Sequence, residues 1–375
     1  MMEPGTARQT AAEQIIADPH GVLLYSTSPV AFPRLKAVLD LHQIPSSEPL
    51  PYTLLMMKDP SLLSAALSQW RDALEDAELR HVRAALIATP QPTAEELAGA
   101  ILQLTSVDTT LARLQGRWLP RLMQSQDSFF SMFQPLVSVS TRQTRAYECL
   151  IRGRDATGVI PAPRLLGAAR TMGIVHELDK AAWRSAIRRG AGLAKQGHQL
   201  FVNFTPSSIA DLKFGLQEAV ATCKEYGVPF ENLVFEVTEG EEIHDIGQLE
   251  KIVNGYRAEG AKVALDDLGS GYSSILHLAD LLPDYVKLDQ GLVRGAHGDY
   301  VRSVLLKAIT DAAHDLGIQV VAEGVETEED LKFCIAIDAD LVQGYYLAYP
   351  AETPLPVSVE ALDTLASWVR ESEEQ

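Results

Sequence analysis

The chain has 375 residues, of which 46% are apolar, and it carries a formal net charge of −18. This apolar content predicts a folded globular protein and argues against a disordered chain. The excess of acidic residues argues against a surface that binds a nucleic-acid polymer through its phosphates, because such a surface needs clustered Lys and Arg. A phosphate-bearing substrate would need metal ions to offset this charge.

The sequence shows no sign of a membrane segment, an export signal or a disulfide framework. The early apolar runs, such as residues 22–25, are too short for a signal peptide or a transmembrane helix. Cys149, Cys223 and Cys334 lie far apart in the chain and form no zinc-binding motif. We therefore expect a cytoplasmic protein with no membrane partner.

Residues 1–92 are expected to form a smaller N-terminal module, either mixed α/β or helical. They contain a possible strand in GVLLY and an acidic helical stretch around residues 67–83, but no motif that indicates a ligand. We regard them as a candidate regulatory module whose function the sequence does not reveal.

Residues 93–122 repeat apolar side chains at spacings of three, four and seven, which predicts an amphipathic helix. Pro120 is expected to end or kink this helix. The pattern fits a helix packed on its own domain better than a signalling coiled coil, because three heptads are few. We treat the segment as a candidate linker to a larger domain, residues 123–375.

From Gln134 onward, short apolar runs alternate with longer amphipathic stretches, which is typical of a β/α protein with a largely parallel sheet. The expected strands are residues 135–140, 146–151, 199–204, 232–238, 262–267, 285–288, 318–323 and 340–343. The expected crossover helices are residues 207–226, 245–260, 300–317 and 327–337. This number of strands predicts a closed, TIM-like (β/α)8 barrel.

The first two strands depart from the pattern. Only residues 141–145 separate them, whereas a parallel crossover needs about a dozen residues or more. We therefore expect the barrel to begin with an antiparallel hairpin.

Polar residues follow the apolar part of most later strands. They are Asn203, Glu236, Glu239, Asp266, Asp267, Lys287, Glu323 and Gln343. In a β/α barrel the carboxyl ends of the strands share one mouth, where active sites form. We therefore expect these side chains to lie close together.

Two pairs of charged residues are ambiguous when each is taken alone. The two-residue period of a strand places Glu148 and Arg152 on one face, where they would also fit a surface ion pair. The adjacent carboxylates of Asp266 and Asp267 repel each other unless a cation lies between them. A tight turn with a capping Asp would explain that pair equally well.

The strand ends taken together favour a metal site. Glu148, Asn203 and Glu236 join Asp266 and Asp267 in a set of oxygen ligands, which suits Mg²⁺ or Mn²⁺ rather than Zn²⁺. None of the nine histidines lies in an HxxxH pair or beside a cysteine. This disfavours metal binding or general-base chemistry by histidine.

The chain from about Phe133 to Pro356 resembles the EAL-domain cyclic di-GMP phosphodiesterases in an ordered set of motifs. They are FQP at 133–135, ECLIR at 148–152, FVNF at 201–204, EVTE at 236–239, DDLGSGYSS at 266–274, VKLD at 286–289, AEGVE at 322–326 and QGYYLA at 343–348. Chance could supply one such block but not the ordered set. The resemblance implies a barrel whose first strand is antiparallel to the rest, in agreement with the expected hairpin.

The resemblance also implies hydrolysis of cyclic di-GMP to linear pGpG with two Mg²⁺ or Mn²⁺ ions, inhibition by Ca²⁺, and a homodimer formed through the barrel. The implied metal ligands are Glu148, Asn203, Glu236, Asp266 and Asp267. The implied substrate contacts are Gln134, Arg152 and Asp289, and the implied catalytic residues are Lys287, Glu323, Gln343 and Glu239. Lys287 would steer the attacking water, whereas Glu239 would hold the loop that follows Asp267.

Three positions depart from the family's usual pattern without removing a metal ligand. Cys149 replaces a small or apolar residue, Gly153 replaces an aromatic residue, and Leu268 replaces a phenylalanine in the loop that links the metal site to the dimer interface. The stretch from Pro163 to Asp179 also lacks an acidic residue that is common in the family's first helix.

Three other functions remain open from the sequence. A non-hydrolysing cyclic di-GMP receptor would signal through the N-terminal module, but such receptors usually lack a catalytic residue, and none is missing here. A barrel that only docks protein partners would have lost its ligand. A lysine-dependent aldolase would need Lys287 in an apolar pocket, which the many carboxylates disfavour.

Overall fold

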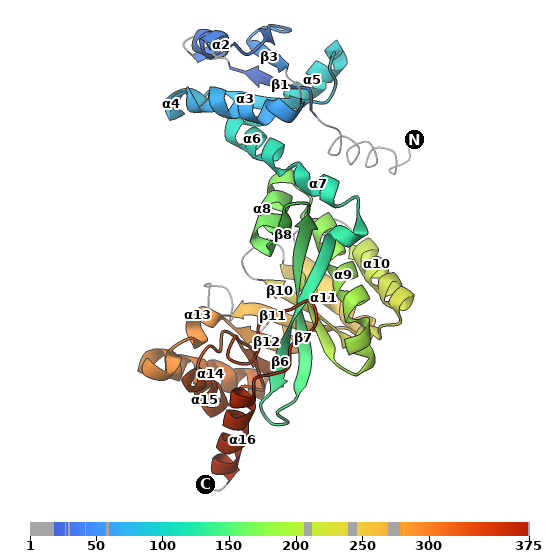
Figure 1. Ribbon diagram of the computed structural model, residues 1–375, viewed down its shortest axis with the longest axis vertical. Coiled ribbons are helices and arrows are strands. Elements are labelled where there is room, and N and C mark those ends of the chain that lie inside the picture. Colours follow the sequence, from blue (N-terminus) through green and yellow to red (C-terminus); the bar gives the residue numbers. More distant parts are fainter. Residues whose placement is uncertain are drawn as a thin grey trace. The chain divides into compact units, whose positions relative to one another are not determined.

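A computed structural model describes residues 19–26, 28, 31–41, 43–57, 60–205, 212–238, 246–268, 278 and 280–373. The chain divides into two compact units. The first comprises Met1–Ser125 and Leu166–Ile174, and the second comprises Gln126–Leu165 and Val175–Gln375. Figure 1 labels their helices and strands.

The first unit contains an antiparallel sheet with the strand order β2-β3-β1-β4-β5. Its strands are β1 (Gly21–Tyr25), β2 (Ser46–Ser47), β3 (Thr53–Met57), β4 (Arg83–Ile87) and β5 (Thr105–Ser106). Its helices are α2 (Ala31–Leu41), α3 (Pro60–Asp72), α4 (Asp76–Leu79), α5 (Ala94–Leu102), α6 (Val107–Gly116) and α7 (Trp118–Leu122). The mixed α/β module and the strand in GVLLY are therefore confirmed. The helical stretch expected around residues 67–83 is split between α3 and α4 and stops before β4.

Residues 93–122 form three helices and a short strand rather than the expected single helix. Thr93 and Ser106 explain the division, because each accepts a hydrogen bond from a backbone N–H three residues later and so begins a new helix. Pro120 lies in the first turn of α7, where its missing N–H is tolerated. Leu97 and Leu114 are buried in the cores of the first unit, so much of this candidate linker contributes to that unit.

The described residues of the second unit form a nine-stranded sheet that closes on itself. Its strands are β6 (Phe129–Ser138), β7 (Thr144–Asp155), β8 (Gly158–Ile160), β9 (Gln199–Phe204), β10 (Leu233–Thr238), β11 (Lys262–Leu268), β12 (Tyr285–Leu288), β13 (Gln319–Ala322) and β14 (Leu341–Val342). The short strand β8 pairs only with the end of β7, and the other strands form the barrel.

Strand β6 is antiparallel to both of its neighbours, β7 and β14, whereas the other barrel strands pair in parallel. The expected hairpin and the (β/α)8 barrel with an antiparallel first strand are thus confirmed. Figure 1 shows β6 and β7 as the two long strands of this hairpin.

Helices follow most barrel strands, as parallel connections require. They are α9 (Val175–Lys195), α10 (Leu212–Tyr226), α11 (Ile246–Ala258), α13 (Gln290–Val293), α14 (Tyr300–Asp315), α15 (Glu328–Ala336) and α16 (Val359–Glu373). Outward-facing strand residues such as Tyr147, Cys149 and Val202 pack with these helices in the main core. Helix α8 (Ala162–Met172) precedes α9, and most of its residues belong to the first unit.

The barrel interior contains a layer to which every strand of the closed barrel contributes one buried side chain. The layer consists of Leu136, Ala146, Phe201, Val234, Ala264, Tyr285, Val321 and Leu341. This apolar plug closes the barrel below its mouth, as in other small β/α barrels. Among the residues that the structure describes, no helix is both long and apolar enough to cross a bilayer.

Candidate active site

A layer of polar side chains lies above the apolar layer, toward the carboxyl ends of the parallel strands. On each parallel strand the polar residue comes two positions after the apolar one, at the end of the strand or just beyond it. On β6, which runs the opposite way, the polar residue comes two positions earlier. The set is Gln134, Glu148, Asn203, Glu236, Asp266, Lys287, Glu323 and Gln343. Because strand side chains alternate between faces, all eight project inward above the plug.

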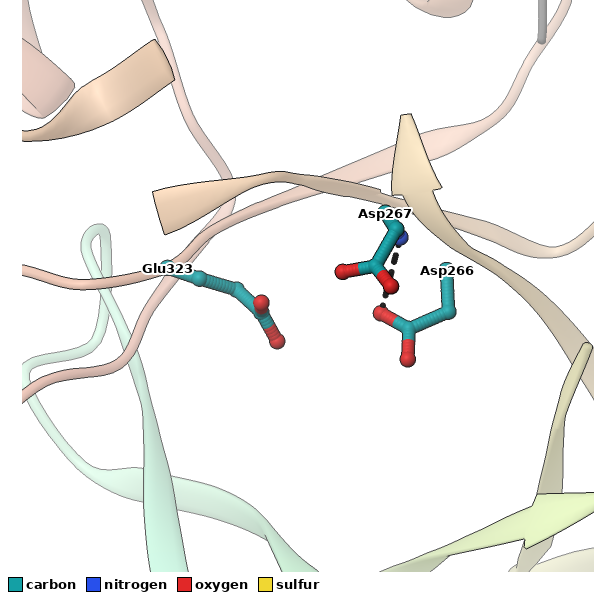
Figure 2. Close-up of side chains that lie close together, drawn as sticks. All are labelled: Asp266, Asp267 and Glu323. Carbon is teal, nitrogen blue, oxygen red and sulfur yellow. Dashed lines mark hydrogen bonds between the residues drawn. The ribbon is translucent and has the colours of Figure 1, made fainter. Parts of the chain in front are cut away.

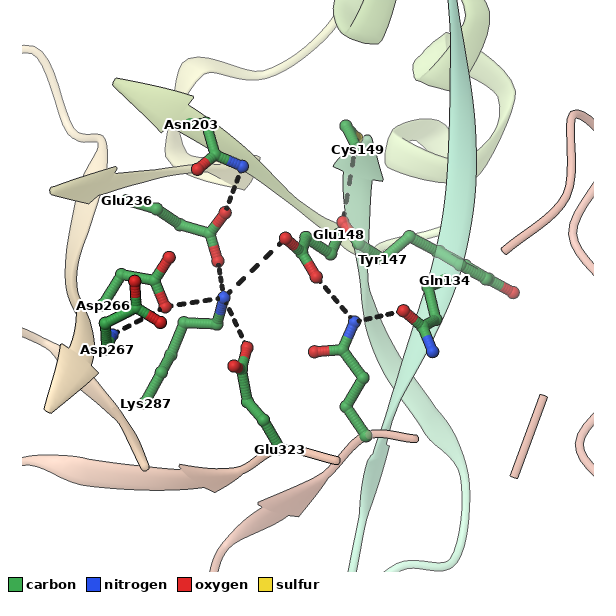
Figure 3. A network of polar contacts seen from close by, with 11 residues as sticks. Gln134, Tyr147, Glu148, Cys149, Asn203, Glu236, Asp266, Asp267, Lys287 and Glu323 are labelled. Carbon is green, nitrogen blue, oxygen red and sulfur yellow. Dashed lines mark hydrogen bonds and ion pairs between the residues drawn. The ribbon is translucent and has the colours of Figure 1, made fainter. Parts of the chain in front are cut away.

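These eight side chains form one connected network, most of which Figure 3 labels. Gln343 donates hydrogen bonds from Nε2 to Glu148 Oε2 (2.7 Å) and to Gln134 Oε1 (3.2 Å). On the other side, Asn203 Nδ2 donates to Glu236 Oε2 at 3.2 Å. Lys287 joins the two halves.

The ammonium group of Lys287 lies at the centre of the network, and its side chain is only 1% exposed (Figure 3). Its Nζ is 2.6 Å from Glu236 Oε1 and 2.6 Å from Glu323 Oε1. Asp266 Oδ1 is 3.0 Å away and Glu148 Oε1 is 3.8 Å away. One buried cation therefore faces four carboxylates, and a negative charge remains in excess.

Burial and the crowding of charges shift the pKa values of the network. Burial raises the pKa of Glu236 well above its ordinary value despite the nearby Lys287. Burial likewise raises the pKa of Glu323 to about 8 and that of Asp267 to about 6. Burial alone would lower the pKa of Lys287, but the surrounding carboxylates outweigh it and hold that pKa above its ordinary value.

Asp266 and Asp267 both reach the site although they are consecutive residues in β11. Consecutive strand residues normally point to opposite faces, but the register with β12 shifts between Leu265 and Leu268. Asp267 adopts a φ of 58° within this irregularity, and its N–H donates to Asp266 Oδ1 at 3.0 Å. The strained backbone turns both carboxylates to the same side (Figure 2).

The arrangement fits a divalent cation. One carboxylate oxygen each from Asp266, Asp267 and Glu323 lies within 4.8 Å of the others (Figure 2). Gln343 Oε1 is buried and has no hydrogen-bond partner among the described residues, so it remains able to accept a bond from a bound water. A set of carboxylate and amide oxygens without Cys or His suits hard cations such as Mg²⁺ or Mn²⁺.

Three predicted site residues are not part of this network in the described structure. The Arg152 guanidinium is half-buried and donates from Nη1 to the Ile151 carbonyl at 2.8 Å. The Asp289 carboxylate caps α13 by accepting from Gly291 N at 2.9 Å. Glu239 lies outside the described residues, as does the part of the DDLGSGYSS motif after Leu268.

Two residues that the sequence did not single out brace the end of β9. Trp183 Nε1 donates to the Asn203 carbonyl at 3.0 Å, and the buried Asp179 accepts from Thr205 N at 3.3 Å. Both lie on α9 one helical turn apart, so they face the same strand. The four-residue spacing of these two residues on an amphipathic helix is the sequence feature that could have identified them.

A cavity of about 280 Å³ opens over the network and is lined by Glu148, Asp266, Lys287 and Glu323. Arg294 also lines it and forms an ion pair with Glu326 at 2.5 Å. This cation at the rim was missed by sequence reasoning, because nothing in the sequence places α13 beside the mouth.

The unusual residues have ordinary structural roles. Leu268 is fully buried in the main core. Cys149 points away from the site into the same core, and burial raises the pKa of its thiol well above the ordinary value. Gly153 pairs with Ile160 where β8 joins β7.

Gly344 allows the segment after β14 to approach a neighbouring loop. A Cβ at this position would lie 2.1 Å from the carbonyl oxygen of Val325 and 2.4 Å from its nitrogen. Val325 N in turn donates to the Gln343 carbonyl at 3.1 Å. The close approach of the two backbones therefore positions the Gln343 side chain.

Replacement of Gly344 by Ala is expected to lower the free energy of unfolding by about 1–3 kcal/mol or more, because the backbones must separate. Displacement of Gln343 should also reduce any activity of the site. Thermal melting would measure the first effect, with Gly192→Ala as control, since a Cβ on that helical glycine meets no atom within 4 Å. Equal stability of the two variants would contradict the prediction.

Comparison with known proteins agrees with this geometry. The family model described as "EAL domain" matches residues 117–350. The chain belongs to the EAL domain family. Its EAL domain therefore coincides with the barrel that carries the network.

Two curated relatives of the EAL domain are similar to it over 58% of this chain. NbdA of Pseudomonas aeruginosa, named a cyclic di-GMP phosphodiesterase, is 30% identical over 222 residues, which cover 28% of that protein. PdeG of Escherichia coli K12, named a probable cyclic di-GMP phosphodiesterase, is 31% identical over 226 residues, or 44% of its length. The matches thus span less than half of either relative.

A solved structure resembles the EAL barrel along nearly its whole length. It is a standalone EAL protein from Vibrio cholerae O395 in its c-di-GMP bound form, with a TM-score of 0.55 and 33% identity. The match covers 62% of this chain and 97% of that one. The N-terminal unit therefore lies mostly outside the similarity.

Proposed function

We propose that this protein hydrolyses cyclic di-GMP to linear pGpG with the help of Mg²⁺ or Mn²⁺. The observation that supports this most is the unbroken ring of eight polar side chains above the apolar plug. A receptor that only binds would not need four carboxylates around a buried lysine. The names of the two curated relatives point the same way.

Glu148, Asn203, Glu236, Asp266 and Asp267 would hold the divalent ions. Two such ions would lower the pKa of a bound water and offset charge on the scissile phosphate.

 Side chains of the protein would carry out the proton transfers and orient the attacking water.

The attacking water must lose a proton as its oxygen bonds to phosphorus, while the bond from phosphorus to the 3′ oxygen breaks and that oxygen gains a proton. Glu323 would take this proton in its carboxylate form, and burial, which raises its pKa, makes it a stronger base than an exposed glutamate. The Lys287 ammonium, 2.6 Å from Glu323, would orient the water and stabilise charge on the phosphate. The free Oε1 of Gln343 would accept the water's second hydrogen.

We place the substrate's other contacts at the rim of the cavity. Arg152 would bind a phosphate oxygen once it leaves the Ile151 carbonyl, and Gln134 would contact the substrate from β6. Asp289 stays a proposed substrate contact, and it would have to release the hydrogen bond that it accepts from Gly291 N. Glu239 stays a proposed anchor of the loop after Asp267.

The decisive test is cleavage of cyclic di-GMP by the full chain, followed by chromatography of the product. We expect pGpG with Mg²⁺ or Mn²⁺ and none after chelation or with Ca²⁺. Calorimetry with Ca²⁺ separates the alternatives, because a receptor would bind cyclic di-GMP yet release no pGpG with any metal. Absence of both binding and turnover in a folded protein would remove the proposal.

We also propose a homodimer. The helix after the Asp266 loop lies largely outside the described residues, but α14 exposes apolar side chains along one face. Val301 is 75% exposed and Val304 is 51% exposed, one turn apart. Association would remove this apolar surface from water.

Replacement of Val301 and Val304 by Lys is expected to convert a dimer to a monomer, because each protomer would bury two positive charges in the interface. Light scattering of the full chain would measure the mass. Leu102→Lys, which changes an 88% exposed residue of the first unit, serves as control and should leave the dimer intact. A wild-type monomer would contradict the proposal. The cytoplasmic location stays a prediction.

A further inference from the structure

The described helices cover the two faces of the N-terminal sheet unequally. One face packs against α2, α3 and α6 through a large apolar core. Among the described helices, only α5 buries side chains in the core of the other face, through Leu97 and Ala100. With 9 residues, α5 is about 13 Å long, so the described helices that cover this face are shorter in total than those on the first face.

A cavity of about 610 Å³ lies between α5, the end of β4 and α6. Small residues create its space, with Ala85 on β4 and Gly99 and Ala100 on α5. A Cβ added to Gly99 would meet no heavy atom within 4 Å, so this glycine faces open space. The volume lies within the range of about 300–1,000 Å³ that is typical of small-molecule sites.

The wall formed by α6 supplies positive charge. Arg113 lines the cavity, and no hydrogen bond or ion pair engages its guanidinium within the described part of the chain. Arg117 lines the same wall one helical turn further on. On the opposite side, Glu95 and Glu96 also line the cavity, and the Glu96 carboxylate accepts from Thr93 N at 2.7 Å, so the anionic head is placed on the α6 wall.

We propose that this cavity binds a small organic acid, with its anionic head on Arg113 and its apolar body over Ala85 and Ala100. A half-buried arginine without a partner among the described residues gains most from a carboxylate, sulfonate or phosphate, which can accept two of its hydrogen bonds. The apolar floor selects against small inorganic anions, since it offers them no hydrogen bonds. The site is independent of the proposed phosphodiesterase activity.

The shape of the site can be tested with 8-anilinonaphthalene-1-sulfonate, which has one anionic group and an apolar aromatic body and fluoresces in apolar sites. We expect saturable one-site binding to the full chain. Gly99→Phe should fill the cavity and weaken binding by at least about tenfold, and its thermal midpoint should not fall, because Gly disfavours helix. Gly192→Phe, at an open helical glycine of the barrel, should bind as wild type does.

The role of charge needs a second pair of measurements. Arg113→Met should weaken binding of the sulfonate by about tenfold, the effect of one charge-assisted hydrogen bond. Arg113→Lys should recover part of that loss, and the uncharged probe N-phenyl-1-naphthylamine should bind equally to wild type and Arg113→Met. Unchanged sulfonate affinity in either Gly99→Phe or Arg113→Met would overturn the proposal.

Discussion

Asp266→Asn is expected to reduce turnover by at least about 10²–10³-fold while leaving the metal-free protein as stable as wild type or more stable. Asp266 is one of the carboxylates that share the single ammonium of Lys287, with its Oδ1 3.0 Å from Nζ. An amide of the same shape removes one negative charge from this crowded site but can still accept the bond from Asp267 N. Repulsion therefore falls, and so does cation binding.

Thermal melting with and without Mn²⁺ would distinguish the two effects of Asp266→Asn. An ion that binds only the folded protein stabilises it by about 2.7 kcal/mol at 100 times its dissociation constant. Wild type should gain stability with Mn²⁺, and the variant should gain much less. Asp311→Asn, at a surface residue that pairs with Lys307, is the matched control. A large loss of stability without metal would show that the Asp266 carboxylate is structural instead.

Lys287→Met is expected to lower the free energy of unfolding of the metal-free protein by about 3–5 kcal/mol, as loss of one partner from a buried ion pair does. The variant keeps a similar side-chain length but leaves Glu236 and Glu323 without their 2.6 Å partner. Turnover should also be lost, since the proposed water-orienting cation is gone. Lys307→Met, at an exposed surface pair, should change stability little.

The loss of stability caused by Lys287→Met should grow as pH rises. Burial raises the pKa of Asp267 to about 6 and that of Glu323 to about 8, whereas unfolded carboxyls titrate near 4. The folded state thus binds more protons between these values, so its stability falls as pH rises through them. Removing the ammonium raises these pKa values further and steepens the fall.

Denaturant titrations of Lys287→Met at pH 6 and pH 8.5 would measure this dependence. The difference from wild type should be larger at pH 8.5, and Mn²⁺ should restore part of the stability but not the turnover. A loss that is equal at both pH values would mean that Lys287 stabilises the fold by packing rather than by offsetting the carboxylates.

The sequence predicted elements correctly where a regular pattern of apolar residues marks them. Residues 199–204 and 285–288 form strands with the predicted bounds, because apolar runs of this length fit buried strands. The prediction was wrong at residues 93–122, because the apolar spacing expected for one long helix also fits the three short helices that the structure contains. There the caps at Thr93 and Ser106 decided the boundaries. Strand β6 also starts earlier than predicted, at Phe129.

The sequence by itself determined which polar residues face the barrel interior, since alternation along each strand places Glu148, Glu236 and Lys287 two positions beyond apolar side chains. Only the tertiary structure decided that Lys287 would lie among four carboxylates, because closure of the barrel brings together strands far apart in the chain. It also decided that Asp266 and Asp267 point the same way, since a local register shift overrides the alternation that the sequence pattern encodes.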